Sequence, residues 1–329
     1  MTTVEDLLKG FEILRADHSG PAPWTLEFSG KTHEQHVLFG GIIHGNETGS
    51  LPSLLELARG LADGSISFGG RVTIMLGNIA ACRANTRFLE ADLNRVFLEE
   101  APQSAEKERA RELMPIIAQA HLFVDFHQTI EPSEKPFFIF PFHISGYQWA
   151  RIAGGGTSLI TRHPSHAFAK GQVCADEYAR NRGIPGITLE MGQKGLTPQA
   201  QELTKQACLR VLRAMDRVAD GCSLDTLVEE TGEPDLEFIE IQFAQPFESS
   251  AMALTPGLQN FTWVTKGQIL GSSGASGDPL TAPRDGYLVF PKYPARDEHG
   301  LVKGPVPSEI YNLATLMPVH PIEAYALSE

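Results

Sequence analysis

The segment VLFGGII at residues 37–43, followed directly by HGNE at residues 44–47, is a clear indication of the fold class. Its first seven residues are uncharged and mostly apolar, which is typical of a buried strand that is covered on both faces. A helical pattern, SLPSLLELARGLAD, follows at residues 50–63. A strand and then a helix in this order predict one unit of an α/β sheet, with the polar HGNE segment at the carboxyl end of the strand.

The same alternation continues on both sides of this unit. Further strands are expected at residues 71–81, 121–129, 136–142 and 183–191, and helices at residues 4–15, 104–120, 171–183 and 197–221. This pattern indicates a sheet with helices on both faces. After about residue 230 short β-type segments take over, at residues 236–247, 261–270 and 286–291. We therefore expect an α/β domain over residues 1–230 and a smaller β-rich domain over residues 231–329.

Composition excludes several classes of protein. The net charge of −13 argues against nucleic acid as a partner, because phosphate binding needs a basic surface. Membrane attachment is not expected, since no apolar run is long enough to span a bilayer and the N-terminus lacks the pattern of a signal peptide. The four cysteines, Cys82, Cys174, Cys208 and Cys222, match no disulfide framework or metal pair. A cytoplasmic protein with reduced thiols is the expectation.

Polar residues at two strand ends are candidates for a metal site. His44 and Glu47 follow the strand at residues 37–43, and His127 ends the segment FVDFH at residues 123–127. Ligands bind at the carboxyl edge of such sheets, and two imidazoles with one carboxylate suit a catalytic zinc ion. Asp125 shares the strand face of His127 and could support that ring. Each histidine alone could equally be a core residue at a strand end.

Glu190 ends another apolar strand, in GITLEMG at residues 186–192. A buried glutamate needs a partner, and beside a metal-activated water it would act as a base. A side chain that points into solvent is the alternative for Glu190.

Two other motifs are interpreted as unrelated to the site. HEQH at residues 33–36 is too short for H-E-x-x-H and suggests a solvated turn, and the spacing of His320 and Glu323 is expected by chance.

Polar groups gather in the segment from Arg87 to Arg95, which also contains Asp92 and Asn94. Arginine binds a carboxylate through two parallel hydrogen bonds, and a side-chain amide can add a third. The segment is therefore either an anion-binding loop or a polar surface loop.

Taken in order, HGNE, R-x-x-x-x-D-x-N-R, D-x-H and E-x-G resemble the succinylglutamate desuccinylase/aspartoacylase family, a branch of the zinc carboxypeptidase superfamily. The resemblance covers about residues 35–200. It implies a mixed central sheet flanked by helices, with a smaller C-terminal β-rich domain that caps the site. It also implies a hydrolase that cleaves the amide bond of an N-acyl amino acid, or of a similar small carboxylate substrate, through a metal-activated water.

The resemblance assigns the metal and the catalytic groups as follows. One zinc ion per chain would be held by His44, Glu47 and His127. Glu190 would be the general base and acid. Arg87 would polarise the scissile carbonyl and stabilise its oxyanion.

The substrate contacts are carried over in the same way. Asn94 and Arg95 would bind the free carboxylate of the amino-acid part, and Asp92 would orient these groups. The family also uses a further arginine for the acyl-side carboxylate and a tyrosine of the C-terminal domain. Arg180 and Tyr287 are the candidates in this chain.

Other activities remain as alternatives. The same groups would serve a metallocarboxypeptidase that acts on peptide C-termini, or a non-catalytic module that binds zinc and a ligand. A serine hydrolase is excluded because no G-x-S-x-G motif occurs; GSSGASG at residues 271–277 has the wrong spacing. The expected partner is a small anionic N-acyl amino acid. The acyl group, the amino acid and the formation of a homo-oligomer stay open.

Overall fold

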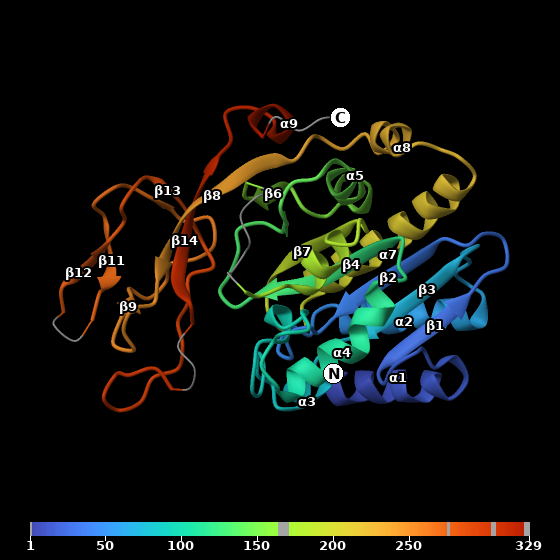
Figure 1. Cartoon of the computed structure of the whole chain (residues 1–329), viewed down its shortest axis with the longest axis horizontal. Coiled ribbons are helices and arrows are strands. Elements are labelled where there is room, and N and C mark those ends of the chain that lie inside the picture. Colours follow the sequence, from blue (N-terminus) through green and yellow to red (C-terminus); the bar gives the residue numbers. More distant parts are fainter. Residues whose placement is uncertain (1, 164–170, 275–276, 304–306, 326–329) are drawn as a thin grey trace.

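A large mixed sheet with helices on both sides forms the first two thirds of the chain (Figure 1). The computed structural model describes residues 2–163, 171–274, 277–303 and 307–325. The strands of this part are β1 (Thr25–Ser29), β2 (His36–Gly41), β3 (Arg71–Leu76), β4 (Leu122–Thr129), β5 (Phe137–Ile139), β6 (Ser158–Thr161) and β7 (Gly186–Gln193). They lie in the order β1-β3-β2-β4-β7-β5-β6. The neighbours β3, β2, β4 and β7 are parallel, so their carboxyl ends share one edge.

Helices cover both faces of this sheet. They are α1 (Val4–His18), α2 (Leu51–Asp63), α3 (Ile79–Arg83), η1 (Leu93–Arg95), α4 (Ala105–Ile117), α5 (Ile144–Ala153), α6 (Ala175–Arg180), α7 (Pro198–Ala219) and α8 (Leu224–Glu230). Val37 and Phe39 pack in the cluster that contains α1, α2, α5 and α7, whereas Leu38 packs in the cluster of α4 and α6. Because β2 is buried on both sides, its sequence is apolar throughout. No helix among the described residues has the length and apolar character needed to cross a membrane.

The turn after β2 brings the HGNE segment to the sheet edge. Ile42 adopts a φ of 48°, a costly conformation for a β-branched residue, where the chain leaves the strand. A Cβ atom on Gly45 would lie 2.3 Å from the backbone of Ala81, so only glycine fits there. This close approach holds the segment against α3.

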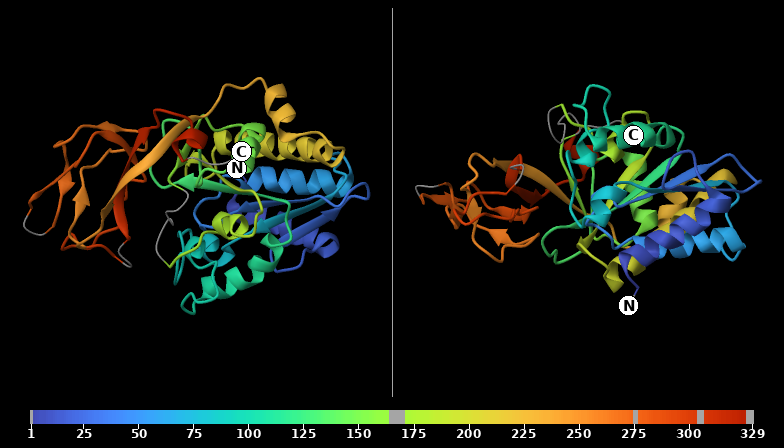
Figure 2. Two further views of the ribbon diagram at one scale, coloured as in Figure 1. Left: turned by 45° about the horizontal axis from the view of Figure 1, so that its top comes forward. Right: turned by 90° about the horizontal axis from the view of Figure 1, so that it is seen from below.

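The C-terminal region continues the same sheet. Its strands are β8 (Glu237–Pro246), β9 (Ala253–Leu254), β10 (Trp263–Val264), β11 (Ile269–Ser272), β12 (Pro279–Thr281), β13 (Gly286–Val289) and β14 (Glu309–Leu316), followed by α9 (Pro321–Ala324). β8 pairs with β6, and β14, β13 and β10 follow in order, while β12, β11 and β9 form a separate three-stranded sheet. Figure 2 shows this region extending to one side of the helix-covered part.

The expected fold class is confirmed: a mixed central sheet flanked by helices, with a smaller β-rich C-terminal region. The expected boundary at residue 230 lies between α8 and β8. Since the sheet passes through this boundary, the division into two domains stays a proposal.

Several element limits differ from the expectation. The strand expected at residues 71–81 ends at Leu76, because the side chain of Asn78 accepts a hydrogen bond from Ala81 N and begins α3. The helix expected at residues 171–183 is limited to α6. Several elements were not predicted from the sequence, among them β1, α5, β6, α8 and β14. β14 mixes apolar and polar residues, and its pairing with β8 and β13 stabilises it as a strand.

The C-terminal strands share a core with the α/β part, and we expect the two to unfold together. Phe137 is fully buried, and its ring lies 5.3 Å from that of Phe261 and 5.9 Å from that of Phe290. Phe137→Ala should cost about 3–5 kcal/mol and lower the midpoint of one cooperative transition in calorimetry. Ile13→Ala, at an exposed position, should change stability by less than about 0.5 kcal/mol. Two separate transitions in the unsubstituted protein would contradict this expectation.

Candidate active site

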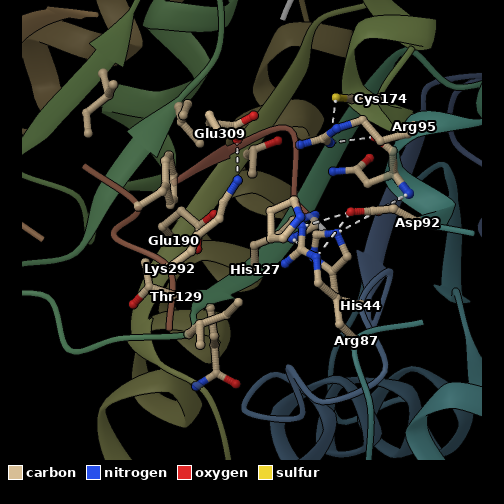
Figure 3. A pocket seen from close by; sticks show the side chains of 18 of the residues that line it. His44, Arg87, Asp92, Arg95, His127, Thr129, Cys174, Glu190, Lys292 and Glu309 are labelled. Atoms are coloured by element: carbon tan, nitrogen blue, oxygen red, sulfur yellow. Dashed lines mark hydrogen bonds and ion pairs between the residues drawn. The ribbon is translucent and has the colours of Figure 1, made fainter. Parts of the chain in front are cut away.

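A cavity of about 480 Å³ lies at the carboxyl ends of β2, β4 and β7 (Figure 3). Its floor carries His44, Glu47, His127 and Glu190, and residues 290–294 and 307–309 of the C-terminal region line it as well. Its volume is in the range of sites for small ligands.

The three candidate ligands converge in this cavity. His44 Nδ1 lies 2.8 Å from Glu47 Oε1, His127 Nδ1 lies 2.9 Å from Glu47 Oε2, and the two Nδ1 atoms are 3.2 Å apart. All three side chains are buried. Stretches of chain that are about 80 residues apart in sequence thus place three ligand atoms around one point.

The other ring nitrogens fix which atoms face that point. His44 Nε2 lies 3.1 Å from Asp92 Oδ1, and His127 Nε2 lies 2.9 Å from Asp125 Oδ2. A carboxylate only accepts, so these contacts assign a proton to each Nε2 and leave the lone pair of each Nδ1 aimed inward. Two lone pairs and a carboxylate that face each other require a positive charge between them.

The pKa values of His127 and Glu47 are set by the charged groups around them. Burial alone would lower the pKa of His127, but the charges of Asp125 and Glu47 raise it well above its ordinary value. Burial alone would raise the pKa of Glu47, but His44 and His127 hold it below its usual range. The cluster therefore attracts either a proton or a metal cation.

The ligand spacing fits a small divalent metal ion. Ligands about 2.0–2.2 Å from a tetrahedral ion are separated from each other by about 3.4 Å. The distances between the three ligand atoms, 2.8–3.2 Å, need only small side-chain shifts to reach this value. His44, Glu47 and His127 together could hold a metal ion.

Glu190 is a buried carboxylate beside this cluster. It lies opposite His127 in the register of the parallel strands β4 and β7. Its Oε2 atom is buried and has no hydrogen-bond partner. Burial and then the charge of Glu47 raise the pKa of Glu190 to about 8. A carboxyl group in this position is suited to exchange protons with a molecule in the cavity.

Arg87 and Asp92 join the loop at residues 87–92 to the metal cluster. Arg87 donates from Nη1 to Glu47 Oε1 at 3.2 Å and from Nε to Asp92 Oδ2 at 3.1 Å. Asp92 in turn holds His44. The four residues form one connected set that lines the cavity.

Asn94 and Arg95 also line the cavity. The side-chain oxygen of Asn94 accepts a hydrogen bond of 2.9 Å from Ala175 N, at the start of α6. Arg95 Nη1 donates to Asn94 O at 2.7 Å and contacts Cys174 Sγ at 3.5 Å. The polar segment predicted from the sequence is thus brought together at the site.

Arg180 and Tyr287 differ in their surroundings from the other predicted substrate-binding residues. Arg180 lines the cavity, but its Nη1 atom donates to Asp176 Oδ2 at 2.5 Å and to Gly186 O at 3.1 Å. Tyr287 is not among the residues that line the cavity; its ring packs against Trp263 at 4.9 Å. Their roles in substrate binding stay predictions.

The cavity residues of the C-terminal region were not predicted from the sequence, and Lys292, Tyr293 and Glu309 are among them. Lys292 forms an ion pair with Glu309, and the hydroxyl of Tyr293 donates to Thr255 O at 2.8 Å. The segment FPKYP at residues 290–294 follows an apolar strand, which was the available signal. The pairing of β13 with β14 was needed to bring Glu309 beside it.

The two motifs that were interpreted as unrelated, at residues 33–36 and 320–323, do not line the cavity. His33 pairs with Asp216, and His320 caps α9. His36 differs from the expected solvated turn, because it is buried at the start of β2 and lies 2.9 Å from Thr73 Oγ1. All four cysteines are free.

Comparisons with known proteins show the family of the chain and relatives of its fold. The sequence matches the family described as succinylglutamate desuccinylase/aspartoacylase catalytic domain over residues 33–217. It is 28% identical over 249 residues to a succinylglutamate desuccinylase of Serratia proteamaculans, and the match covers 72% of this chain and 74% of the relative. The fold is similar to that of a succinylglutamate desuccinylase from Vibrio parahaemolyticus (TM-score 0.66, 17% identity, 91% of this chain and 89% of that one). It is also similar to murine aminoacylase 3 (TM-score 0.55, 21% identity, 86% and 96%).

We expect the protein to bind one divalent cation through the three converging side chains. Zn²⁺ at about 100 times its Kd should stabilise the metal-free protein by about 2.7 kcal/mol and raise its Tm by several degrees. His127→Ala should abolish this shift, and His299→Ala, at an exposed position, should leave it unchanged. Differential scanning fluorimetry with metal analysis measures both. Full zinc occupancy in His127→Ala would contradict the ligand assignment.

Proposed function

Because the chain belongs to the succinylglutamate desuccinylase/aspartoacylase family, we propose that it is a zinc-dependent amidohydrolase. Its substrate is an N-acyl amino acid or a similar small carboxylate-bearing amide. The observation that carries the proposal is the convergence of His44, Glu47 and His127 beside the unpartnered carboxylate of Glu190.

Zinc suits this ligand set, because two histidines and one glutamate leave a coordination position open. His44, Glu47 and His127 hold the ion in this proposal. When bound, zinc supplies Lewis-acid chemistry, which lowers the pKa of water and polarises a carbonyl oxygen. Asp125 and Asp92 keep the two imidazole rings in the orientation that binds metal.

Glu190 is the proposed general base and acid. Its free Oε2 atom faces no competing donor of the protein. A cation held by the neighbouring ligands would favour the ionised form of Glu190. The carboxylate then takes a proton from the attacking water and delivers it to the nitrogen of the leaving amine, so that one group serves both steps. Arg87 stabilises the negative charge that develops on the carbonyl oxygen.

Arg95 and Asn94 are the proposed binding groups for the carboxylate of the amino-acid part. Both line the same cavity as Glu190, and the guanidinium of arginine can donate two parallel hydrogen bonds to a carboxylate. Since the protein as a whole is strongly acidic, this local positive charge is what an anionic substrate requires.

The C-terminal region supports a small substrate over a peptide. Lys292, Tyr293 and Glu309 line the cavity together with residues of the α/β part. We propose that residues 231–329 act as a cap on the catalytic domain of residues 1–230. Such a cap limits the length of chain that can extend beyond the scissile bond.

A hydrolysis screen tests the proposed activity. The zinc-loaded protein should release the free amino acid from at least one member of a panel of N-succinyl and N-acetyl amino acids, and chelation should remove this activity. Stoichiometric zinc without hydrolysis over the panel would instead favour a ligand-binding module. Release of C-terminal residues from peptides would favour a carboxypeptidase.

The variant Glu190→Gln tests whether Glu190 acts as the base and not as a metal ligand. The variant should keep one zinc ion per chain and lose about 10²–10⁴-fold in kcat, because the amide cannot accept the proton. Glu298→Gln, at an exposed position, should keep the full rate. An unchanged kcat in Glu190→Gln would remove the base role.

Arg95→Ala should mainly raise KM. The loss of a charged hydrogen bond to the substrate carboxylate costs about 1.5–3 kcal/mol, so KM should rise by about 10–100-fold with a smaller change in kcat. Arg213→Ala, an exposed arginine of α7, is the matched control. An unchanged KM would count against this assignment.

A further inference from the structure

Glu106, in the first turn of α4, is a buried carboxylate with an unusual number of hydrogen-bond donors around it. It accepts from Leu89 N at 2.8 Å, from Ala91 N at 3.0 Å, from Glu90 N at 3.2 Å and from Asn78 Nδ2 at 3.1 Å. Its side chain is 2% exposed. The two oxygens thus use nearly all the acceptor capacity of a carboxylate.

The charge of Glu106 strengthens these bonds. Burial alone would raise the pKa of Glu106, but the hydrogen bonds from Leu89, Ala91 and Asn78 outweigh it and hold the pKa below its ordinary value. The group is therefore ionised at neutral pH. Hydrogen bonds to an ionised acceptor are roughly twice as strong as those between neutral groups.

The three amides that Glu106 binds belong to the loop between Arg87 and Asp92. This loop has no regular secondary structure, so it has no ladder of backbone hydrogen bonds to define its path. Arg87 and Asp92 nevertheless meet across it at 3.1 Å. Arg87 then reaches Glu47, and Asp92 reaches His44.

Glu106 is not needed to start its own helix. Ser104 is the N-cap of α4, and its hydroxyl accepts a hydrogen bond of 3.0 Å from Lys107 N. Apart from an interaction with its own backbone amide, the carboxylate of Glu106 makes its hydrogen bonds to the loop and to Asn78. Most of its contacts therefore serve the loop.

We infer that Glu106 is a positioning residue of the amidohydrolase site, which fixes the loop at residues 87–92 so that Arg87 faces the scissile carbonyl and Asp92 holds His44. This inference rests on the proposed function. Because Arg87 acts on the transition state, disorder of the loop lowers kcat more than it raises KM. Because Asp92 orients a metal ligand, the same disorder weakens zinc binding.

The test is Glu106→Gln, which replaces one carboxylate oxygen by an NH2 group. The substitution removes the negative charge, and the NH2 group cannot accept hydrogen bonds from the backbone amides of the loop. We expect kcat on the best substrate to fall at least about 10-fold with KM little changed, and the zinc Kd to rise by about 10-fold or more. Both are measured well below the Tm of the variant.

Asp216→Asn is the matched control. Asp216 also accepts hydrogen bonds from a backbone amide, Gly69 N at 3.0 Å, and from a side chain, His33 at 2.8 Å, but it does not line the cavity. This variant should lose stability while it keeps the kcat and the zinc Kd of the unsubstituted protein.

Asn78→Asp serves as a second variant if Glu106→Gln does not fold. It keeps the oxygen that caps α3 through Ala81 N and places a like charge against Glu106. We expect the same fall in kcat and in zinc affinity, smaller in size.

Unchanged kcat and zinc Kd in a folded Glu106→Gln variant would overturn the inference, as would a loss of Tm alone. The zinc measurement needs no substrate. If the unsubstituted protein hydrolyses no N-acyl amino acid, the proposed function fails, and the zinc Kd still decides the role of Glu106.

Discussion

Two imidazole lone pairs and a carboxylate meet at one buried point, and the surrounding site is built around this contact. Without a cation between them, His44, His127 and Glu47 would repel each other in surroundings that water cannot screen. The carboxylates of Asp92 and Asp125 make this arrangement definite, since each holds the outer nitrogen of one ring. The ligand atoms are therefore directed before any metal binds, which is the preorganisation that a catalytic site requires.

Cations and carboxylates line the cavity together in a protein that is acidic as a whole. The chain carries a net charge of −13, yet Arg87, Arg95 and Lys292 all line the one cavity that also contains the metal cluster. Acidic partners keep these cations in place, as Asp92 does for Arg87 and Glu309 for Lys292. The proposed anionic substrate would thus meet individual cations, each held beside a carboxylate. Local pairing, not overall charge, sets the potential that such a substrate meets.

The C-terminal region affects the site through the continuity of the sheet. β8 pairs with β6, and β14 and β13 extend the sheet from there. This continuity carries residues 290–294 and 307–309 to the cavity. Aromatic packing of Phe137 with Phe261 and Phe290 joins the two parts. Because this junction is a shared core and not a flexible linker, it holds the C-terminal residues that line the cavity in place.

The fold class and most of the candidate residues could be predicted from the amino-acid sequence. Apolar strands that alternate with helices form a covered sheet, and polar residues that follow such strands gather at its carboxyl edge. The partners of the side chains became known from the folded structure alone. Arg180 is engaged by Asp176 and Gly186, Tyr287 lies outside the cavity lining, and Lys292 takes part in that lining. The physical reason is that the partner of a long side chain depends on elements far away in the chain, and local periodicity carries no information about them.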